Sequence, residues 1–371
     1  MAARGLSSAE ADETACWLAS QQLRDGMIPW YRGGHSDPWN HVEAAMALAA
    51  AGRWAEVERA FVWLESNQLP DGSWCAAYVP GGVLEPHRDP NVCGYVATGA
   101  WWCAGLGAGL GFLERLWPMV ERALSWCLSH QGRDGEIVWS VGPDGSRAPY
   151  ALLSGNSSLH LSLTCAAEAA VALGRDPAPW AQAASRIAEA VKEPPQGFAQ
   201  KDRWAMDWYY PVLTSVLSGD RALQRLRGRW DQLVVPGLGV RCVADRFWVT
   251  AAETAESAMA AGRAGLRAEA LELLSWTRHL RHPSGAYWTG CAHPECKRFP
   301  GGQLSTYSAA AVLIADHVLA YRSPAARIFA GEKGSLSLQR GDGSLRARRD
   351  WTTEVAAWRP DPMQAGTPTR P

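Results

Sequence analysis

The sequence has 371 residues, a formal net charge of −1 and 47% hydrophobic residues. The charge balance argues against a nucleic-acid partner, which would require a basic surface, and the composition excludes global disorder. No uninterrupted apolar run reaches the ~18–20 residues of a transmembrane segment. The N-terminus lacks the apolar core of a secretion signal, so we expect a cytoplasmic protein. The nine scattered cysteines are expected to be reduced.

A repeated turn follows several of the predicted helices. In each copy a Trp is followed five residues later by Gln, and then four residues later by Gly. The three copies are Trp17, Gln22 and Gly26; Trp63, Gln68 and Gly72; and Trp126, Gln131 and Gly135. A fainter copy has Trp276, Arg281 and Gly285. Glycine can end a helix in the left-handed conformation, and Gln can bond free backbone groups there. We therefore interpret the repeat as a staple between neighbouring helices.

These turns separate pairs of helices. Alanine-rich segments predict six inner helices, at 40–51, 91–105, 157–173, 206–218, 251–262 and 305–321. Outer helices are predicted between them, at 9–22, 54–67, 115–130, 178–192, 220–230 and 266–280. Short apolar runs at 136–139 and 246–249 are interpreted as loop hairpins rather than as a sheet.

The turn at 59–74, which reads RAFVWLESNQLPDGSW, resembles the QW motif of the prenyltransferase and squalene–hopene cyclase superfamily. The match is complete there, partial at 17–26 and 122–135, and faint at 276–285. The resemblance implies an all-α fold, an (α/α)6 toroid in which a double ring of about twelve helices surrounds a cavity. We expect this toroid domain over residues 1–322. A polar, flexible and disordered C-terminal tail is expected over 323–371, in which only 325–329 docks on the ring.

The sequence departs from this superfamily at its reactive motifs. It has neither the DxDD acid of terpenoid cyclases nor the DDxxD magnesium motif, and it does not match the zinc site of protein prenyltransferases. One loop holds Cys291, His293 and Cys296 but lacks a fourth metal ligand. We therefore predict no metal, and the cofactor stays undefined.

Acidic residues recur where the inner helices are predicted to begin. The candidate catalytic residues are Asp37, Asp89, Asp207, Glu253 and Glu256. Asp37 and Asp89 each precede a proline, so capping of a helix explains them equally well. Glu253 and Glu256 share one helix face and could form an acid–base pair, or be neutralised by Arg241 or Arg246.

Aromatic and polar side chains near the same helix starts are candidates for substrate binding. These are Trp39, His41, Asn91, Tyr95, Asn156, Trp208, Tyr209, Tyr210 and Tyr307. Because the inner helices of a closed ring point the same ends at one mouth, we expect a single pocket to gather six polar side chains and three aromatic wall residues. The six are Asp37, Asp89, Asn156, Asp207, Glu253 and Tyr307, and the walls are Trp39, Trp208 and Tyr210.

The function expected from the resemblance is a prenyltransferase-like or terpenoid-cyclase-like enzyme acting on an isoprenoid in the cavity. Aromatic walls also stack on sugar rings, so a carbohydrate-active (α/α)6 enzyme with a carboxylate pair is one alternative. A ligand-binding toroid without catalysis is the other. The predicted partner is a small molecule, either an isoprenoid or a sugar, and the oligomeric state is left open.

Overall fold

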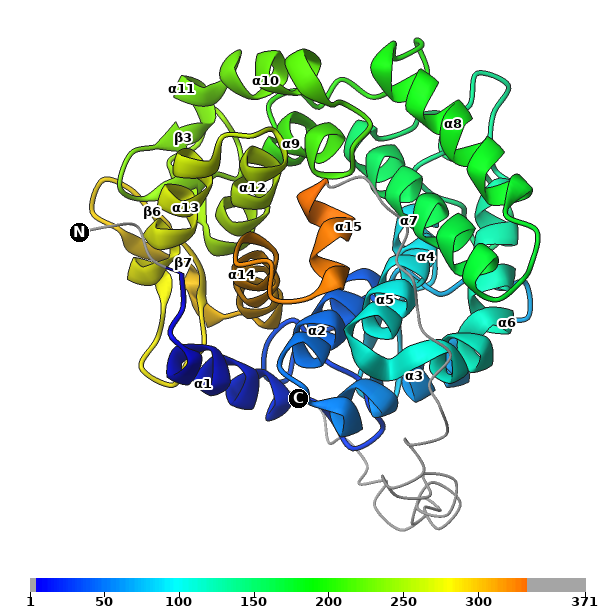
Figure 1. The fold of residues 1–371 in the computed structure, drawn as a ribbon, viewed down its shortest axis with the longest axis horizontal. Coiled ribbons are helices and arrows are strands. Elements are labelled where there is room, and N and C mark those ends of the chain that lie inside the picture. The colour runs from blue at the N-terminus through cyan, green and yellow to red at the C-terminus, as the bar shows by residue number, and fades with distance from the viewer. Residues whose placement is uncertain (1–4, 332–371) are drawn as a thin grey trace, which may run out of the picture. The chain divides into compact units, whose positions relative to one another are not determined.

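The computed structural model describes residues 5–331, and within them the helices form two concentric rings (Figure 1). The inner helices are α2 (Pro38–Ala50), the broken pair α4 (Pro90–Gly94) and α5 (Val96–Cys103), α7 (Leu153–Ala172), α9 (Ala205–Leu213), α12 (Ala251–Arg263) and α14 (Thr306–Leu319). The outer helices are α1 (Ser8–Ala19), α3 (Trp54–Asn67), α6 (Gly109–Leu128), α8 (Ala178–Lys192), α10 (Gly219–Arg227) and α13 (Arg267–Trp276). The predicted all-α toroid is confirmed.

The inner ring is closed by contacts between consecutive helices. α2 packs on α5, α5 on α7, α7 on α9, α9 on α12, α12 on α14, and α14 packs back on α2. These helices are buried nearly all round, and small side chains such as Ala255 and Ala258 allow close approach of their backbones. In this order α4–α5 and α12 lie on opposite sides of the ring, three steps apart in either direction.

The repeated turn acts as a staple between adjacent outer helices. Gln68 Nε2 donates to the carbonyl of Gly72 at 2.9 Å and to that of Met119, on the next outer helix, at 2.9 Å. Gln22 and Gln131 make the same pair of bonds. Gly72 has φ +97°, and a Cβ there would lie 2.5 Å from the Arg122 carbonyl oxygen. The turn therefore requires glycine for both its conformation and its close contact.

The fainter fourth copy closes the ring. Arg281, which stands in place of Gln, donates to the Glu10 carbonyl at 3.2 Å and to the Glu13 carboxylate at 2.7 Å. Both acceptors belong to α1, the first outer helix. A Cβ at Gly285 would lie 2.6 Å from the Glu13 carbonyl oxygen. The last outer turn therefore packs on the first outer helix in the way that the earlier turns pack on their successors.

A sheet replaces the staple between α10 and α14. Its antiparallel strands, in the order β3-β4-β5-β6-β7, are Val234–Val235, Gly239–Arg241, Trp248–Thr250, Trp288–Ala292 and Lys297–Leu304. The prediction of a loop hairpin at 246–249 is therefore wrong, because Trp248 pairs with the sequence-distant Ala292. The run at 136–139 forms isolated bridges, to Gln131 and to Ala151. A separate hairpin pairs β1 (Ala77–Val79) with β2 (Gly82–Glu85).

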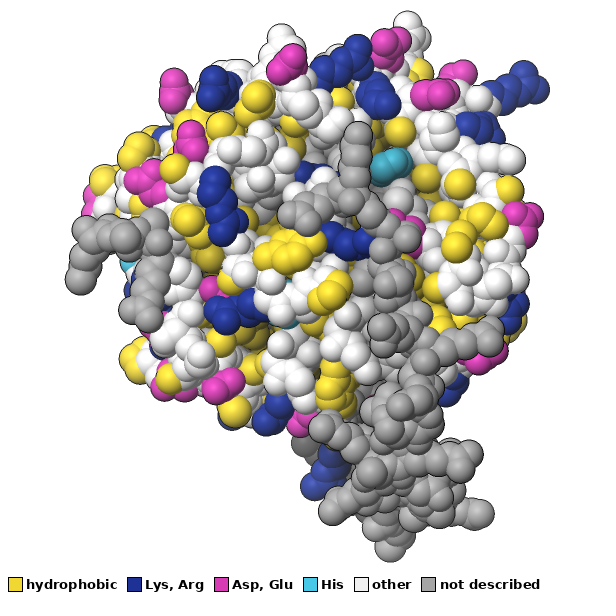
Figure 2. All heavy atoms as spheres, in the orientation of Figure 1, with side chains coloured by type: hydrophobic (Ala, Val, Ile, Leu, Met, Phe, Trp, Pro, Cys, Tyr) yellow, Lys and Arg dark blue, Asp and Glu magenta, His cyan; other side chains and the backbone are white. Residues whose placement is uncertain are grey.

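One mouth of the ring is closed by the last described helix, α15 (Arg327–Ala330), which follows the short turn η3 (Pro324–Ala326) (Figure 1). α15 packs on α12 and α14, and Phe329 is buried with its ring 5.7 Å from that of Trp102. Arg263 Nη1 donates to the Ile328 carbonyl at 3.1 Å. Figure 2 shows side chains filling the centre of this face, with basic and acidic groups interspersed around it.

The predicted boundary between ring and tail at 322/323 is therefore too early, because η3 and α15 belong to the packed ring. Their apolar side chains, such as Ile328 and Phe329, bury against the ends of the inner helices, as expected for the docking of residues 325–329. The flexible tail expected beyond them, at 332–371, lies outside the described residues.

Within residues 5–331, one segment is long and apolar enough to cross a membrane by length and composition, Pro90–Leu128. It consists of α4, α5, the π-helical turn Ala104–Ala108 and α6. In the structure 56% of its most apolar window is buried, and Trp101 and Trp102 are covered completely. This burial is typical of a core helix, as its place in both rings indicates.

Candidate functional site

The starts of the inner helices meet at the mouth opposite α15 and carry the predicted acids. Asp37 caps α2 by accepting from the Asn40 backbone N–H at 2.9 Å, and its other oxygen accepts from the Trp30 indole at 2.5 Å. Asp89 caps α4 by accepting from the Asn91 N–H at 2.8 Å. Both acids are therefore helix caps. A carboxyl group that caps a helix can still react with a ligand, because each of these two also faces other groups at this mouth.

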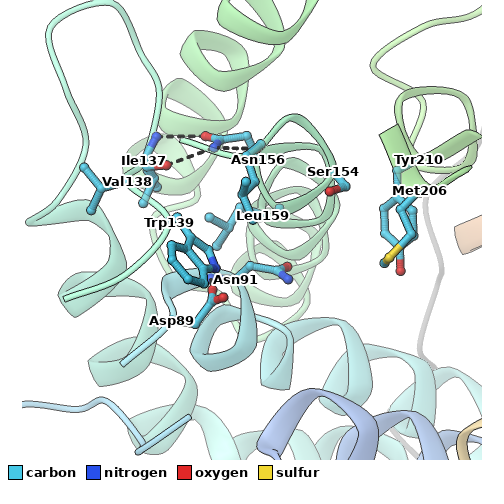
Figure 3. Close-up of a pocket in the computed structure, with 12 residues that line it drawn as sticks. Asp89, Asn91, Ile137, Val138, Trp139, Ser154, Asn156, Leu159, Met206 and Tyr210 are labelled. Atoms are coloured by element: carbon cyan, nitrogen blue, oxygen red, sulfur yellow. Dashed lines mark hydrogen bonds between the residues drawn. The ribbon is translucent and has the colours of Figure 1, made fainter. Parts of the chain in front are cut away.

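A cavity of about 150 Å³ opens beside Asp89 (Figure 3). Its polar lining is formed by Asp89, Asn91, Ser154, Asn156 and Tyr210, and Trp139 stands over Asp89 in Figure 3. The apolar lining is Ile137, Val138, Leu152, Leu159 and Met206, with Gly155 beside them. A concave site that is largely apolar and holds a few converging polar groups is typical of small-ligand binding.

The Asp89 carboxyl group has the electrostatics of a proton donor. Burial raises its pKa to about 7, and the neighbouring charge of Asp37 adds to this, although the capping N–H groups of Asn91 and Val92 act in the opposite direction. Burial also raises the pKa of Asp37. A carboxyl group with a pKa near 7 holds its proton in a large fraction of molecules at neutral pH, which a general acid requires.

Below the mouth lies a group of acids and tyrosines that we call the floor cluster: Glu43, Tyr95, Tyr209, Glu256 and Tyr307. The Tyr95 hydroxyl donates to Glu43 at 2.6 Å, the Tyr307 hydroxyl donates to Glu256 at 2.7 Å, and Tyr209 also donates to Glu256. Burial raises the pKa of Glu43 to about 7 and that of Glu256 well above its usual range, and the charge of Glu43 adds to the shift of Glu256. The cluster is therefore a hydrogen-bonded platform with protonated acids near neutral pH.

The remaining acids occupy the α9 and α12 sides of the mouth. Asp207 is 4% exposed and accepts from the Ser154 backbone N–H at 3.1 Å, and burial raises its pKa. Glu253, 9% exposed, accepts from the Thr250 hydroxyl. The alternative in which Arg241 or Arg246 neutralises Glu253 and Glu256 is not supported, because both arginines are engaged elsewhere. Arg241 donates to the carbonyls of Gln232 and Ala244, and Arg246 lies over the Trp248 ring.

The expectation of one pocket shared by six polar side chains is wrong, because only Asp89 and Asn156 among them line this cavity. Asp207 adjoins it through Ser154, and Tyr307 belongs to the floor cluster. The ring does bring the helix starts together, but successive residues on one helix reach different depths. The acids are therefore distributed between the wall, the rim and the floor.

Trp208 and His41, which were predicted to bind substrate, serve the architecture instead, and Asn156 does so while also lining the cavity. Trp208 is fully buried and its indole donates to carbonyls of α10, so it faces the outer ring. The His41 ring bridges the Ile28 N–H and the Ala60 carbonyl, and burial lowers its pKa to about 4. The Asn156 amide forms hydrogen bonds with the backbone of Ile137 and Leu152, which holds the 137–139 loop beside the cavity (Figure 3).

The other predicted aromatics stand closer to the site. Trp39 stacks on Tyr95, with ring centroids 4.6 Å apart, and meets the edge of Tyr307 at 5.5 Å. Tyr210 and Asn91 line the cavity directly, and the Asn91 side-chain oxygen is buried with no hydrogen-bond partner. Such an oxygen is available to a ligand hydroxyl group.

Glu43 and Trp139 are among the site residues that were not predicted as candidates from the sequence. Glu43 was open to the argument applied to Glu256, because it is an acid within an alanine-rich inner helix. Trp139 had no such signal. Its position depends on the bonds that Asn156 makes to the loop.

Comparison with known proteins separates the candidate functions. The chain is 40% identical to MMP endo-(1,4)-3-O-methyl-alpha-D-mannosidase of Mycolicibacterium hassiacum over 326 residues, which cover 88% of this chain and 90% of that protein. No family model matches the sequence.

Solved structures of glycosidases share the fold. A wild-type glycosidase superposes with a TM-score of 0.68 at 15% identity, covering 86% of this chain and 100% of that chain. The GH63 mannosylglycerate hydrolase of Thermus thermophilus, in complex with glucose, gives a TM-score of 0.63 at 13% identity, covering 82% and 99%. A D-mannose isomerase gives 0.62 at 11% identity, covering 83% and 96%.

These findings overturn the expected prenyltransferase or terpenoid cyclase and its isoprenoid substrate. The QW-like turn misled because its Gln and Gly residues hold the outer helices of a toroid together, which says nothing of the reaction inside. The carbohydrate-active alternative agrees with the comparisons. The chain belongs to the glycoside hydrolase family of the Mycolicibacterium hassiacum endo-mannosidase.

Proposed function

We propose that this chain hydrolyses internal α-(1,4) bonds of a 3-O-methylated mannose chain, at the mouth formed by the starts of its inner helices. The relative from M. hassiacum supports the substrate class, through 40% identity over most of both chains. The observation that carries the reaction is Asp89, a carboxyl group on the cavity wall whose pKa is raised to about 7.

In the proposed reaction Asp89 donates its proton to the glycosidic oxygen as the bond breaks. A glycosidase needs a second carboxyl group on the other face of the sugar ring, to activate water or to attack the anomeric carbon. Glu253 starts α12, which lies opposite α4–α5 in the closed ring. We assign the second role to Glu253. Hydrolysis by a pair of carboxyl groups requires no cofactor.

In this proposal a stacked pair of aromatic rings and the floor cluster position the sugar. Trp139 stacks on Tyr150 with centroids 5.4 Å apart and planes inclined by 14°, which gives a flat aromatic surface beside Asp89. Such surfaces bind the apolar faces of sugar rings. The floor cluster lies deeper, and its hydroxyl groups already donate to Glu43 and Glu256. Through Tyr95 and Tyr307 it supports Trp39 beneath the sugar without reacting.

The apolar part of the cavity suits a methylated sugar. Hydroxyl groups of an ordinary mannose would meet Ile137, Val138, Leu152, Leu159 and Met206 without a hydrogen bond. A methyl ether buries its carbon against such side chains. One methyl group in an apolar pocket is worth about 1–3 kcal/mol, or roughly 10- to 200-fold in kcat/KM.

Asp89→Asn and Glu253→Gln test the assignment of the pair, with Asp144→Asn, on an exposed loop, as a matched control. We expect each site variant to lose about 10²- to 10⁴-fold in kcat on a methylated mannose oligosaccharide, and the control to keep full activity. An activated substrate with a good leaving group, such as a dinitrophenyl mannoside, needs no acid. It should restore the rate of Asp89→Asn but not that of Glu253→Gln.

The acid also predicts the alkaline side of the pH profile. Activity should fall as pH rises through about 7, since Asp89 then loses the proton that it must donate. Full oligosaccharide activity in Asp89→Asn, with an unchanged profile, would overturn its role as the acid. No hydrolysis of any mannoside by the wild-type protein would overturn the function itself.

Met206→Gln tests the methyl site, with Leu84→Gln on the exposed β2 strand as its control. We expect the wild-type protein to prefer the methylated substrate by about tenfold or more in kcat/KM. Met206→Gln should reduce this preference by impairing the methylated substrate alone. Equal activity of the wild-type protein on both substrates would contradict the assignment.

A further inference from the structure

Two cysteines and a histidine meet on the sheet side of the ring, away from the cavity lining. Cys291 lies in β6, Cys296 in the turn before β7, and His279 in the short helix η2 (Thr277–Leu280). Their sulfur atoms and a ring nitrogen of His279 all lie within 4.8 Å of one another. The sequence suggested His293 as the histidine beside these cysteines, but the structure brings in His279 from an earlier segment.

The arrangement fits a zinc ion in both ligand type and spacing. Zinc is held by thiolates and imidazole in tetrahedral sites, with Zn–S of about 2.3 Å and Zn–N of about 2.0–2.1 Å, so its ligand atoms lie roughly 3.5–3.8 Å apart. The observed cluster is at most about 1 Å wider than this. Small side-chain rotations would close it, with solvent in the fourth position.

One ring nitrogen of His279 is already hydrogen-bonded to the backbone. Nε2 lies 2.8 Å from the Leu238 carbonyl oxygen, and a carbonyl only accepts, so Nε2 carries the proton. The lone pair is then on Nδ1. Zinc-bound histidines almost always donate their other N–H to a carbonyl or carboxylate in this way. Arg298 also donates to the His279 backbone carbonyl at 3.1 Å, which fixes η2 beside the hairpin.

The backbone around the two cysteines is likewise held in place. Cys291 pairs with Val249 of β5 on one side and with Arg298 of β7 on the other. Cys296 sits in the connecting turn with φ +53°, a conformation uncommon for residues other than glycine. The turn therefore directs a second thiol toward the strand that carries the first.

We propose that His279, Cys291 and Cys296 bind a zinc ion that ties η2 to the β6–β7 hairpin. The ion would take no part in the reaction, because its ligands are not among the residues that line the cavity beside Asp89. β5 leads directly into α12 with Glu253, and β7 leads into α14 with Tyr307. A metal here would hold the loops that deliver these two residues to the mouth. This proposal stands independently of the proposed reaction.

The direct test is the zinc content of the full chain, purified under reducing conditions, loaded with ZnCl₂ and desalted. We expect one zinc per chain by mass spectrometry of the metal. Cys296→Ser and His279→Ala should each lower this to a small fraction, while Cys16→Ser, a change at an exposed cysteine, should not. Chelation should lower the melting temperature of the wild-type protein and leave that of Cys296→Ser unchanged.

A measurement on the unmodified protein covers the case in which the variants fail to fold. Titration with Co²⁺ should produce thiolate-to-metal charge-transfer absorption that saturates at one equivalent and disappears on addition of Zn²⁺. Absence of this band and of bound zinc would overturn the proposal. A Cys291–Cys296 disulfide that persists in the reduced preparation would also overturn it. Such a disulfide would lower the protein mass by 2 Da, and a stronger reductant would restore the full mass.

Discussion

The two sides of the ring hold their loops by different means. From α1 to α8 the outer helices are joined by side chains, because each Gln of the repeat reaches the carbonyls of its own turn and of the next outer helix. From α10 to α13 the connections are made mainly by the backbone of a five-stranded sheet, and after α13 Arg281 takes the place of the repeat's Gln by bonding to α1. A side-chain staple requires particular residues at fixed spacing, so it can be recognised in the sequence. Backbone pairing between short strands that are distant in the chain requires almost no such pattern.

Both sides nevertheless deliver equivalent groups to the site. The stapled side supplies Asp89 at the mouth and Glu43 in the floor cluster, and the sheet side supplies Glu253 near the start of α12 and Glu256 in the floor cluster. The inner helices set these positions, because they alone are common to both sides. The Gln staples and the sheet determine how firmly the start of each inner helix is held.

The largest loss of stability is expected where a glycine of the staple or of the sheet lies in close contact with neighbouring backbone. Gly72→Ala on the stapled side places a Cβ 2.5 Å from the Arg122 carbonyl at φ +97°. The combined strain and overlap should cost about 3–5 kcal/mol in the free energy of unfolding. Gly81→Ala is the matched control, because its φ is +82° with no atom within 4 Å, and it should cost only about 1–2 kcal/mol.

Gly290→Ala makes the same test on the sheet side, where a Cβ would lie 2.3 Å from the Val249 carbonyl oxygen. We expect a loss comparable to that of Gly72→Ala, because both contacts are with backbone that cannot easily move. Chemical denaturation measures all three variants. If Gly72→Ala costs no more than Gly81→Ala, the repeat does not depend on close packing.

The same contrast explains what could be predicted from the sequence. Helices α3 and α8 were placed at their observed bounds, because apolar periodicity and turn glycines are local signals. β5 was missed because its partner β6 is distant in the chain and each strand is short. Asp37, Asp89, Asp207, Glu253 and Glu256 were predicted from their place near helix starts, whereas Glu43, which lies inside α2, was not. The separation of the acids into wall, rim and floor was not predicted, since depth depends on side-chain packing across the ring.

The floor cluster predicts a change of stability with pH. The pKa of Glu43 is about 7 in the folded chain against an ordinary 4.5, so its contribution to stability is full below about pH 4.5 and is lost as pH rises through 7. Glu43→Gln keeps an acceptor for Tyr95 and cannot ionise. It should therefore be more stable than the wild-type protein at pH 8, by up to about 3 kcal/mol, and similar at pH 5.

Urea denaturation at pH 5 and pH 8 measures this difference. Asp144→Asn serves as control, since Asp144 is exposed and should leave the difference between the two pH values unchanged. Equal pH dependence in Glu43→Gln and the wild-type protein would show that this glutamate ionises freely, contrary to the buried floor cluster.

The staple itself is expected to contribute less than the glycine contact beside it. Gln68→Ala removes the donor shared by the Gly72 and Met119 carbonyls and the acceptor used by Arg122. The loss should be about 1–3 kcal/mol in the free energy of unfolding. Gln196→Ala, at an exposed glutamine in the loop after α8, should change stability by less than about 0.5 kcal/mol. Similar losses at both positions would remove the distinction between the two sides.

The smallest effect is expected where the two sides meet. Arg278, before the sheet hairpin, donates to Glu10 of α1 at 2.6 Å, and together with Ser7 this holds the pKa of Glu10 at about 2. Since the folded pKa lies below the ordinary 4.5, the pair stabilises the protein above about pH 4.5 and loses its contribution as pH falls toward 2. Both side chains are partly exposed, so screening limits the effect to about 1 kcal/mol. A double-mutant cycle of Glu10→Gln and Arg278→Gln, by urea denaturation at pH 6, separates the ion pair from the cap that Glu10 forms with Ser7. We expect the coupling free energy to be much smaller at pH 2, where Glu10 is about half protonated, and a coupling of zero at pH 6 would mean that the ion pair does not help to hold α1 against the last outer turn.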